Sequence, residues 1–330
     1  MTIQITIIGL GQIGASIGLG LAGQGEIIRR VGHDREIEIA RQAEKLGALD
    51  KAMNNLPAAV READLVILSL PMDQIRETMS LVAPHLKEGA VLMDTGPVKE
   101  VVAAWAGELL PNDRHYIGLT PVINPAYLHA PDSGLEAAHA DLFRGGLIAI
   151  AAPPRSSSEA IKLAADLTRL LGATPLFADP IELDGLMAAT HQLPQLLAAA
   201  LLNATVDQPG WREGRKVAGR AFAEATGPMV HMSEPKSLRT SVMLNRENLL
   251  RLIDSTSAAL QTIRTDINEE NFDALEERLE RARQGRDLWW RQRQAGDWLN
   301  GEAVPAQGGS SSSDVFGRLL GFGRKPKDKK

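Results

Sequence analysis

Three glycines near the N-terminus have the spacing of a phosphate-binding turn. They follow a β-branched stretch at residues 3–8 and precede an apolar helical pattern at residues 15–22. In a strand–turn–helix unit the first glycine permits the turn, the second lets the backbone approach a pyrophosphate, and the third lets the helix pack closely on the strand. The helix N-terminus then offers unpaired N–H groups to the anion. We therefore predict a dinucleotide site at Gly9, Gly11, Gln12, Ile13 and Gly14.

An acidic residue lies at the distance that such a site requires. Residues 27–32 have the pattern of a second strand, and Asp34 follows 20 residues after Gly14. Its carboxylate is expected to accept hydrogen bonds from the adenosine ribose hydroxyls and to repel a 2′-phosphate, which favours NAD over NADP. Arg35 lies beside it, where it would either stack on adenine or soften the rejection of NADP. The alternative is a glycine turn of an unrelated α/β protein, with Asp34 as a loop residue.

Strands and helices alternate through the first half of the chain. Apolar runs at residues 63–71, 90–94, 116–121 and 146–151 predict strands of a sheet covered on both faces, and a short strand at 173–178 is expected to extend it. Ligands of such sheets bind beyond the carboxyl ends of the strands. The turns at those ends are either ordinary connections or part of one crevice with the glycine turn. On the second interpretation, the further cofactor-binding residues are Ser69, Leu70, Pro71, Thr95 and Gly96.

The composition changes in the second half of the chain. A Pro- and Ser-rich stretch at residues 152–158 suggests a domain boundary, and residues 181–293 have helical patterns almost throughout. We therefore predict an α/β fold, with an N-terminal Rossmann-type doubly wound parallel sheet at residues 1–155 and an all-α domain at 156–295. Long apolar helix faces with little sheet to cover them indicate a homodimer through the helical domain. A flexible Ser/Gly-rich and basic tail is predicted at 296–330.

Composition and charge exclude several classes of function. The chain has 330 residues, a net charge of −5 and a pI near 5.9, which argues against nucleic-acid binding. It has no cysteine, so disulfides, thiolate metal sites and a cysteine nucleophile are excluded, and a reducing cytoplasm fits. Its first residues enter a strand at once, which leaves no room for a signal peptide. We expect a cytoplasmic protein that binds a small molecule, without a metal or stable membrane association.

Further motifs accompany the glycine turn. In the first half of the chain they are Gly32-His33-Asp34-Arg35, Asp94-Thr95-Gly96 with Val98-Lys99, and Ser133-Gly134-Leu135-Glu136. In the helical half they are Pro194 before Leu196-Leu197-Ala198, and Asn245-Arg246-Glu247. With them the chain resembles the prephenate/arogenate dehydrogenase family over about residues 3–287. Those enzymes oxidise and decarboxylate prephenate or arogenate, pass hydride to NAD(P), and form dimers through their helical domain. The resemblance implies the same fold, an NAD cofactor and a role in tyrosine biosynthesis.

The departures from the family's pattern lie on the substrate side. The family has a His-Pro pair whose histidine takes the proton of the ring hydroxyl as hydride leaves, and here the pair is Thr120-Pro121. A threonine hydroxyl cannot act as a base near neutral pH. The serine that supports that histidine falls at Pro97, and the arginine that grips the substrate carboxylate falls at Gly227. Both histidines of the family's Ser-His-Leu-Pro-His run are glutamines here, namely Gln192 and Gln195.

The cofactor side shows no matching loss, so we expect NAD binding with altered substrate chemistry. On a first interpretation, prephenate or arogenate is oxidised with a relocated base, either His191 or His129. The latter lies in a loop that is about five residues longer than in the family. His191 is otherwise a core histidine bonded to a helix carbonyl. Arg220, Lys236 or Arg239 would then replace the carboxylate clamp.

Two other interpretations remain open. The chain is either a dehydrogenase for a different small cyclic or hydroxy acid, or a non-catalytic NAD-binding regulator. In the former case Thr120 and the two glutamines recognise neutral polar groups. The fold alone does not choose among the three. The catalytic candidates are thus Thr120, His129 and His191, and the substrate-binding candidates are Gln192, Gln195 and Arg220.

Overall fold

The computed structural model describes residues 2–230 and 235–296 and divides the chain into two compact units. The first unit is Met1–Pro180 together with the chain from Arg293 onward, and the second is Ile181–Gln292. The predicted boundary between residues 155 and 156 is therefore too early, because the helix and strand that follow it still belong to the sheet unit. The predicted tail lies outside the described residues, apart from Gly296.

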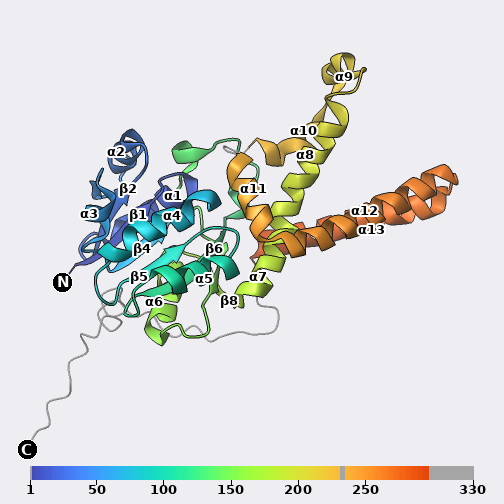
Figure 1. Cartoon of the computed structure of the whole chain (residues 1–330). Coiled ribbons are helices and arrows are strands. Elements are labelled where there is room, and N and C mark those ends of the chain that lie inside the picture. The colour runs from blue at the N-terminus through green and yellow to red at the C-terminus, as the bar shows by residue number, and fades with distance from the viewer. Residues whose placement is uncertain (1, 231–234, 297–330) are drawn as a thin grey trace, which may run out of the picture. The chain divides into compact units, whose positions relative to one another are not determined.

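An eight-stranded sheet forms the centre of the first unit (Figure 1). Its strand order is β3-β2-β1-β4-β5-β6-β7-β8. The strands are β1 (Ile3–Ile8), β2 (Ile28–His33), β3 (Lys51–Ala52), β4 (Leu65–Leu68), β5 (Val91–Asp94), β6 (His115–Val122), β7 (Leu147–Ala151) and β8 (Thr174–Ala178). The sequence predicted each of these strands except β3, which has two residues and no apolar run of its own.

The direction of the last two strands corrects the prediction of a fully parallel sheet. Strand β7 pairs antiparallel with β6, and β8 pairs parallel with β7, so both run opposite to the other six. A parallel neighbour requires a crossover that is usually an α-helix. The chain between β6 and β7 contains only two short 3-10 turns, Pro125–Tyr127 and Gly134–Ala137. The antiparallel direction of β7 agrees with the lack of a crossover helix in this connection.

Helices cover both faces of the sheet (Figure 1). They are α1 (Gln12–Gly20), α2 (Ile37–Lys45), α3 (Leu56–Val60), α4 (Met72–Val82), α5 (Glu100–Leu109) and α6 (Ser158–Leu170). Every residue of β1, β4 and β5 is buried, as continuous apolar strands between two helical layers should be. The core of the unit includes Ile5, Ile7 and Leu10 from the first strand and turn, packed with Ile17 of α1 and Ile67 of β4. The predicted α/β class is thereby confirmed.

The described part of the second unit consists of helices and the turns that connect them. Its helices are α7 (Pro180–Met187), α8 (Leu193–Thr205), α9 (Trp211–Val217), α10 (Arg220–Thr226), α11 (Pro235–Leu244), α12 (Arg246–Asn268) and α13 (Phe272–Ala295). The sequence predicted one helix over residues 236–267, but the chain breaks at Asn245, whose φ of −113° is not helical. A similar break at Gly219 separates α9 from α10.

A π-helical turn, Ala188–Gln192, joins α7 to α8 where one continuous helix was predicted. The N–H of Leu193 bonds to the carbonyl of Ala188, five residues back, instead of four. Pro194 explains this local change, because it has no N–H to offer the carbonyl of Thr190. The wider turn accommodates one more residue than an α-helix would.

Helices α12 and α13 form an antiparallel hairpin (Figure 1). The buried carboxylate of Asp266 accepts from Arg278 Nε at 2.5 Å, which links the two helices. Just beyond the end of α12, Glu270 has a left-handed conformation, with φ of +49°. There Asn271 N donates to Asp266 O at 2.9 Å and Glu270 N to Ile267 O at 3.2 Å. These two bonds satisfy carbonyls that the end of the helix leaves open.

Candidate functional site

The glycine turn between β1 and α1 has the geometry that a pyrophosphate requires. Gly9 has φ of +90°, and a Cβ there would lie 2.2 Å from the carbonyl oxygen of Ser69. A Cβ at Gly14 would lie 2.0 Å from the carbonyl oxygen of Gly9. A Cβ at Gly11, in contrast, would meet no atom within 4 Å. The first and third glycines are thus required by packing, whereas the second leaves bare backbone facing open space at the N-terminus of α1.

Asp34 is held against this turn by two backbone donors. Leu10 N donates to Asp34 Oδ2 at 2.9 Å, and Glu36 N donates to Asp34 Oδ1 at 3.0 Å. A carboxylate has about four acceptor sites, so each oxygen keeps capacity for a ribose hydroxyl. Arg35 is exposed next to it. The carboxylate is therefore positioned before any ligand arrives.

The turns after β4 and β5 lie next to the glycine turn. The Ser69 carbonyl packs on Gly9, and Ser69 Cβ is the side-chain atom nearest to the position of a Cβ on Gly14. Thr95 N donates to Leu68 O at 3.0 Å, and Thr95 Oγ1 lies 3.4 Å from Ser69 Oγ. Gly96 N donates to the Asp94 carboxylate at 2.8 Å. The remaining predicted cofactor residues, Leu70 and Pro71, are half-buried in the same turn as Ser69.

These residues fit a dinucleotide. The open backbone at Gly11 and the first turn of α1, where Gln12 and Ile13 lie, suit a pyrophosphate. Asp34, at the end of β2, suits a ribose on one side of β1, and Ser69 with Thr95 forms a polar edge on the other side. The predicted crevice residues of the first unit are thus contiguous.

Thr120 is buried on β6, opposite Ala149 of β7, and only 3% of it is exposed. Its Oγ1 has no hydrogen-bond partner in the structure. Because side chains alternate along a strand, Thr120 shares one face of the sheet with Tyr116 and Gly118. Pro97, which stands where a supporting hydroxyl was expected, offers none. The position therefore holds an unpaired hydroxyl instead of a base.

The lengthened loop after Pro121 contains His129, the second candidate base, which is exposed. The loop is held by Tyr127, whose hydroxyl donates to Asp141 Oδ1 at 2.7 Å and whose ring stacks on His139 at 4.4 Å. His139 N in turn donates to Ser16 Oγ of α1 at 3.0 Å. None of these described contacts joins His129 to Thr120.

In the helical unit, His191 lies on the π-helical turn. Its carbonyl accepts from Gln195 Nε2 at 2.9 Å, so a predicted substrate-binding residue is bonded to the backbone of a predicted catalytic residue. The ring keeps contact with solvent, while surrounding protein lowers the pKa of His191 by desolvation. The imidazole is therefore neutral near pH 7 and able to accept a proton.

Gln192, which was predicted to bind the substrate, lies in the interior of the helical unit. Its side chain is 0% exposed. Its Nε2 donates to Ser241 Oγ, and its Oε1 accepts from Asn245 Nδ2 at 2.8 Å. Asn245 Nδ2 also donates to the carbonyl of Asp184 at 2.8 Å. Gln192 therefore joins α7, α11 and α12 inside the unit, and burial of its amide is compensated by these bonds.

The remaining substrate-side positions are accessible. Arg220 begins α10 and is exposed. Gly227, where the family's arginine falls, has φ of −49°, and a Cβ there would meet no atom within 4 Å. A side chain at Gly227 would thus be accepted by the backbone and by its surroundings.

Sequence reasoning missed a buried ionic cluster after β5. Lys99 Nζ lies 2.7 Å from Asp94 Oδ1, and the two side chains are 1% and 0% exposed. Tyr116 donates to the other carboxylate oxygen at 2.6 Å. The motif was noticed only as part of a resemblance. Its signal was an aspartate that ends an apolar strand and a lysine five residues later, since neither is buried without a partner.

Among residues 2–230 and 235–296, no group of three or more His, Cys, Asp or Glu side chains has a metal-binding arrangement. Within the same residues, no helix combines the length and apolar character needed to cross a membrane.

Two sequence models of one family match this chain. Residues 17–175 match the model described as prephenate dehydrogenase, nucleotide-binding domain, and residues 179–281 match prephenate dehydrogenase, dimerization domain. A cyclohexadienyl dehydrogenase of Zymomonas mobilis is 27% identical over 285 residues, which are 86% of this chain and 94% of that protein. A prephenate dehydrogenase of Bacillus subtilis is 25% identical over 285 residues, covering 86% of this chain and 75% of that protein.

The fold agrees with these matches. A crystal structure of prephenate dehydrogenase from Aquifex aeolicus, in complex with hydroxyphenyl propionate and NAD+, has a TM-score of 0.76 and 22% identity. The alignment covers 87% of this chain and 98% of that one. Both units described above are therefore accounted for by one family, and the chain belongs to the prephenate/arogenate dehydrogenase family.

Proposed function

We propose that this chain is an NAD-dependent dehydrogenase of the prephenate type, acting on a small cyclic or hydroxy acid. The observation that carries the proposal is the turn at Gly11, where bare backbone at a helix N-terminus faces open space beside the fixed carboxylate of Asp34. That combination suits a dinucleotide whose adenosine ribose carries no 2′-phosphate.

Bound NAD would supply the acceptor for the hydride that leaves the substrate. The N–H groups of the first turn of α1 would bind its pyrophosphate, and the Asp34 oxygens would accept from the ribose hydroxyls. The hydroxyls of Ser69 and Thr95, which lie 3.4 Å apart, would line the opposite half of the crevice. These residues bind and orient, and none of them needs to exchange a proton.

Thr120 governs which substrates fit. Leaving a buried hydroxyl unsatisfied costs about 1–3 kcal/mol, and a neutral polar group of the substrate in contact with Thr120 would remove that cost. A threonine cannot take up a proton near pH 7. We therefore propose that the substrate differs from prephenate, or that its proton leaves through the neutral imidazole of His191.

A paired assay tests this function. NAD affinity is measured first, and NADH formation is then followed with prephenate, arogenate and a panel of small cyclic and hydroxy acids. Turnover of a panel acid but not of prephenate supports the altered substrate. Prephenate turnover that is lost in His191→Ala supports the relocated base. NAD binding without any turnover would make the chain a regulator, and absence of NAD binding would refute the proposal.

Asp34 should make NAD bind more tightly than NADP, because a carboxylate repels the 2′-phosphate. In Asp34→Asn the dissociation constant for NADP divided by that for NAD should fall by about tenfold, which corresponds to about 1.4 kcal/mol. Glu36→Gln is the matched control, since it removes an exposed neighbouring charge and should leave the ratio within about twofold. Equal titration curves for NAD and NADP in the unaltered protein would contradict this assignment.

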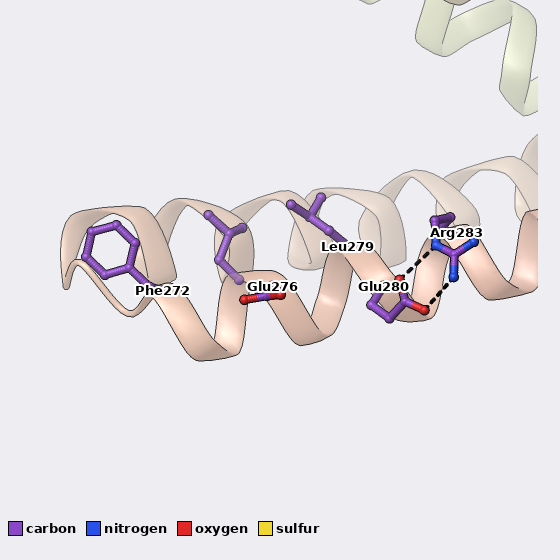
Figure 2. Close-up of a pocket in the computed structure, with 6 residues that line it drawn as sticks. Phe272, Glu276, Leu279, Glu280 and Arg283 are labelled. Atoms are coloured by element: carbon purple, nitrogen blue, oxygen red, sulfur yellow. Dashed lines mark hydrogen bonds and ion pairs between the residues drawn. The ribbon is translucent and has the colours of Figure 1, made fainter.

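We also propose that the helical unit forms a homodimer. Figure 2 shows a pocket lined along the single helix α13 by Phe272, Leu275, Glu276, Leu279, Glu280 and Arg283. Phe272 is 77% exposed and Leu279 is 59% exposed, which is unusual for large apolar side chains on helices. One helix cannot enclose a ligand, whereas a second copy could cover this strip. The match to a dimerization domain over residues 179–281 supports that occupant.

Leu279→Lys should weaken the dimer by about 100-fold, because it would bury an unpaired ammonium in the interface. Leu81→Lys on α4 is the matched control, since Leu81 is 53% exposed on a helix of the sheet unit. Sedimentation over a concentration series measures both variants. A full-length protein that sediments as a monomer at micromolar concentration would refute the dimer.

A further inference from the structure

The Asp94 carboxylate is fixed from three directions. Its Oδ1 accepts from Lys99 Nζ at 2.7 Å and from Gly96 N at 2.8 Å, and its Oδ2 accepts from the Tyr116 hydroxyl at 2.6 Å. Asp94 is 0% exposed, Lys99 1% and Tyr116 6%. Hydrogen bonds in such a dry cluster are electrostatically stronger than in water. Gly96 is therefore attached to a group that can hardly move.

Two glycines, Gly118 and Gly96, lie close to this cluster. A Cβ at Gly118 would lie 2.7 Å from Lys99 Cδ and 3.1 Å from the Tyr116 hydroxyl oxygen. A Cβ at Gly96 would lie 2.9 Å from Ile75 Cδ1 and 3.1 Å from Asp94 Oδ1. Gly118 thus leaves the space that Lys99 and Tyr116 occupy beside the carboxylate, and the turn that contains Gly96 is closely packed.

This cluster fixes the turn at Thr95 and Gly96, which adjoins the dinucleotide crevice. Thr95 Oγ1 lies 3.4 Å from Ser69 Oγ, and the carbonyl of Ser69 packs directly on Gly9. An unbroken set of contacts therefore runs from the Tyr116 hydroxyl to the glycine turn. Displacement of Asp94 would move Thr95 relative to a ligand bound at that turn.

The strand order tells which half of the ligand lies there. Strand β1, with the pyrophosphate turn, lies between β2 on one side and β4 with β5 on the other. Asp34 follows β2 directly and suits the adenosine ribose. The two halves of a dinucleotide extend to opposite sides of its pyrophosphate. The nicotinamide half would therefore extend over Ser69 and Thr95.

We propose that Tyr116 is a positioning residue for the nicotinamide half of NAD, acting through Asp94 on the Thr95–Gly96 turn without touching the cofactor. The inference rests on the proposed function, because it requires NAD at this site. It adds a role for a hydroxyl that lies on the buried part of β6 and that no motif indicates.

Tyr116→Phe removes the hydroxyl and keeps the ring. Binding of NADH and of ADP-ribose, which lacks the nicotinamide, is measured by calorimetry, together with the anisotropy of bound NADH fluorescence. NADH affinity should fall by about tenfold and its anisotropy should decrease, while ADP-ribose affinity should change by less than about twofold. Tyr127→Phe is the matched control, because its hydroxyl also donates to a carboxylate of this unit, that of Asp141. It should change neither affinity.

A merely structural Tyr116 gives a different result. The thermal midpoint of Tyr116→Phe would then fall while the two affinities stay unchanged or weaken by the same factor, and this overturns the inference. If the unaltered protein binds ADP-ribose but Tyr116→Phe binds NADH normally, the inference alone fails. If the unaltered protein binds neither ligand, the proposed function fails and the inference with it.

Discussion

The triple variant Thr120→His/Pro97→Ser/Gly227→Arg should oxidise prephenate about 10²–10⁴-fold faster than the unaltered protein, which is the usual contribution of a positioned acid/base. The histidine would take the hydroxyl proton, the serine would orient the imidazole, and the arginine would hold a carboxylate. The open surroundings of Gly227 allow the last change. NADH formation from prephenate measures the gain.

Thr120→His alone should recover little of this rate. The site of Thr120 is buried, so a larger side chain must also be accommodated at a cost of about 1–3 kcal/mol. Groups that act as a unit are not additive, and the triple variant should exceed the sum of the single ones. The opposite finding would be a fast native enzyme that tolerates Thr120→Ala but loses activity in His191→Ala or His129→Ala. It would show that the base has moved.

Lys99→Met should lower the free energy of unfolding by about 3–5 kcal/mol, because it leaves the Asp94 carboxylate buried without its counter-charge. The double variant Lys99→Met/Asp94→Asn should recover more than half of that loss. It removes both charges and keeps an acceptor for Gly96 N. Urea titration followed by circular dichroism gives these values.

Lys87→Met is the control for this effect. Lys87 also pairs with an aspartate, Asp64, but its side chain is 38% exposed. Pairs in contact with water contribute little, so this change should cost less than about 1 kcal/mol. Similar losses of unfolding free energy for Lys87→Met and Lys99→Met would contradict this prediction. They would mean that burial of the Lys99–Asp94 pair has no energetic consequence.

The cofactor side was predictable because its chemistry is local in sequence. The separate roles of Gly9, Gly11 and Gly14 follow from one strand, one turn and one helix, and the distances around each glycine agree with those roles. Asp34 was found by its spacing, and its contact with Leu10 N places it where the spacing implied. The same local motifs predicted the family and the fold class, which the two family models and the observed sheet confirm.

The substrate side was less predictable because it depends on tertiary contacts. Nothing in the sequence around Gln192 shows that Ser241 and Asn245, about fifty residues later, complete its hydrogen bonds. The domain boundary was misplaced for a similar reason. A Pro- and Ser-rich connection resembles a linker, yet β8 beyond it pairs with β7. Composition marks where a chain turns and does not show which strand it joins afterwards.

The π-helical turn at residues 188–192 also alters the rotational phase of the helix that contains it. Each residue of an α-helix advances by about 100°, and the wide turn absorbs one additional residue, so a wheel continued from α8 at that angle is offset by about 100° in α7. A helical wheel drawn through both helices therefore assigns the wrong residues to the interior. Loss of one residue here, with the wide turn becoming an ordinary α-helical turn, would therefore leave unchanged the face that α7 presents.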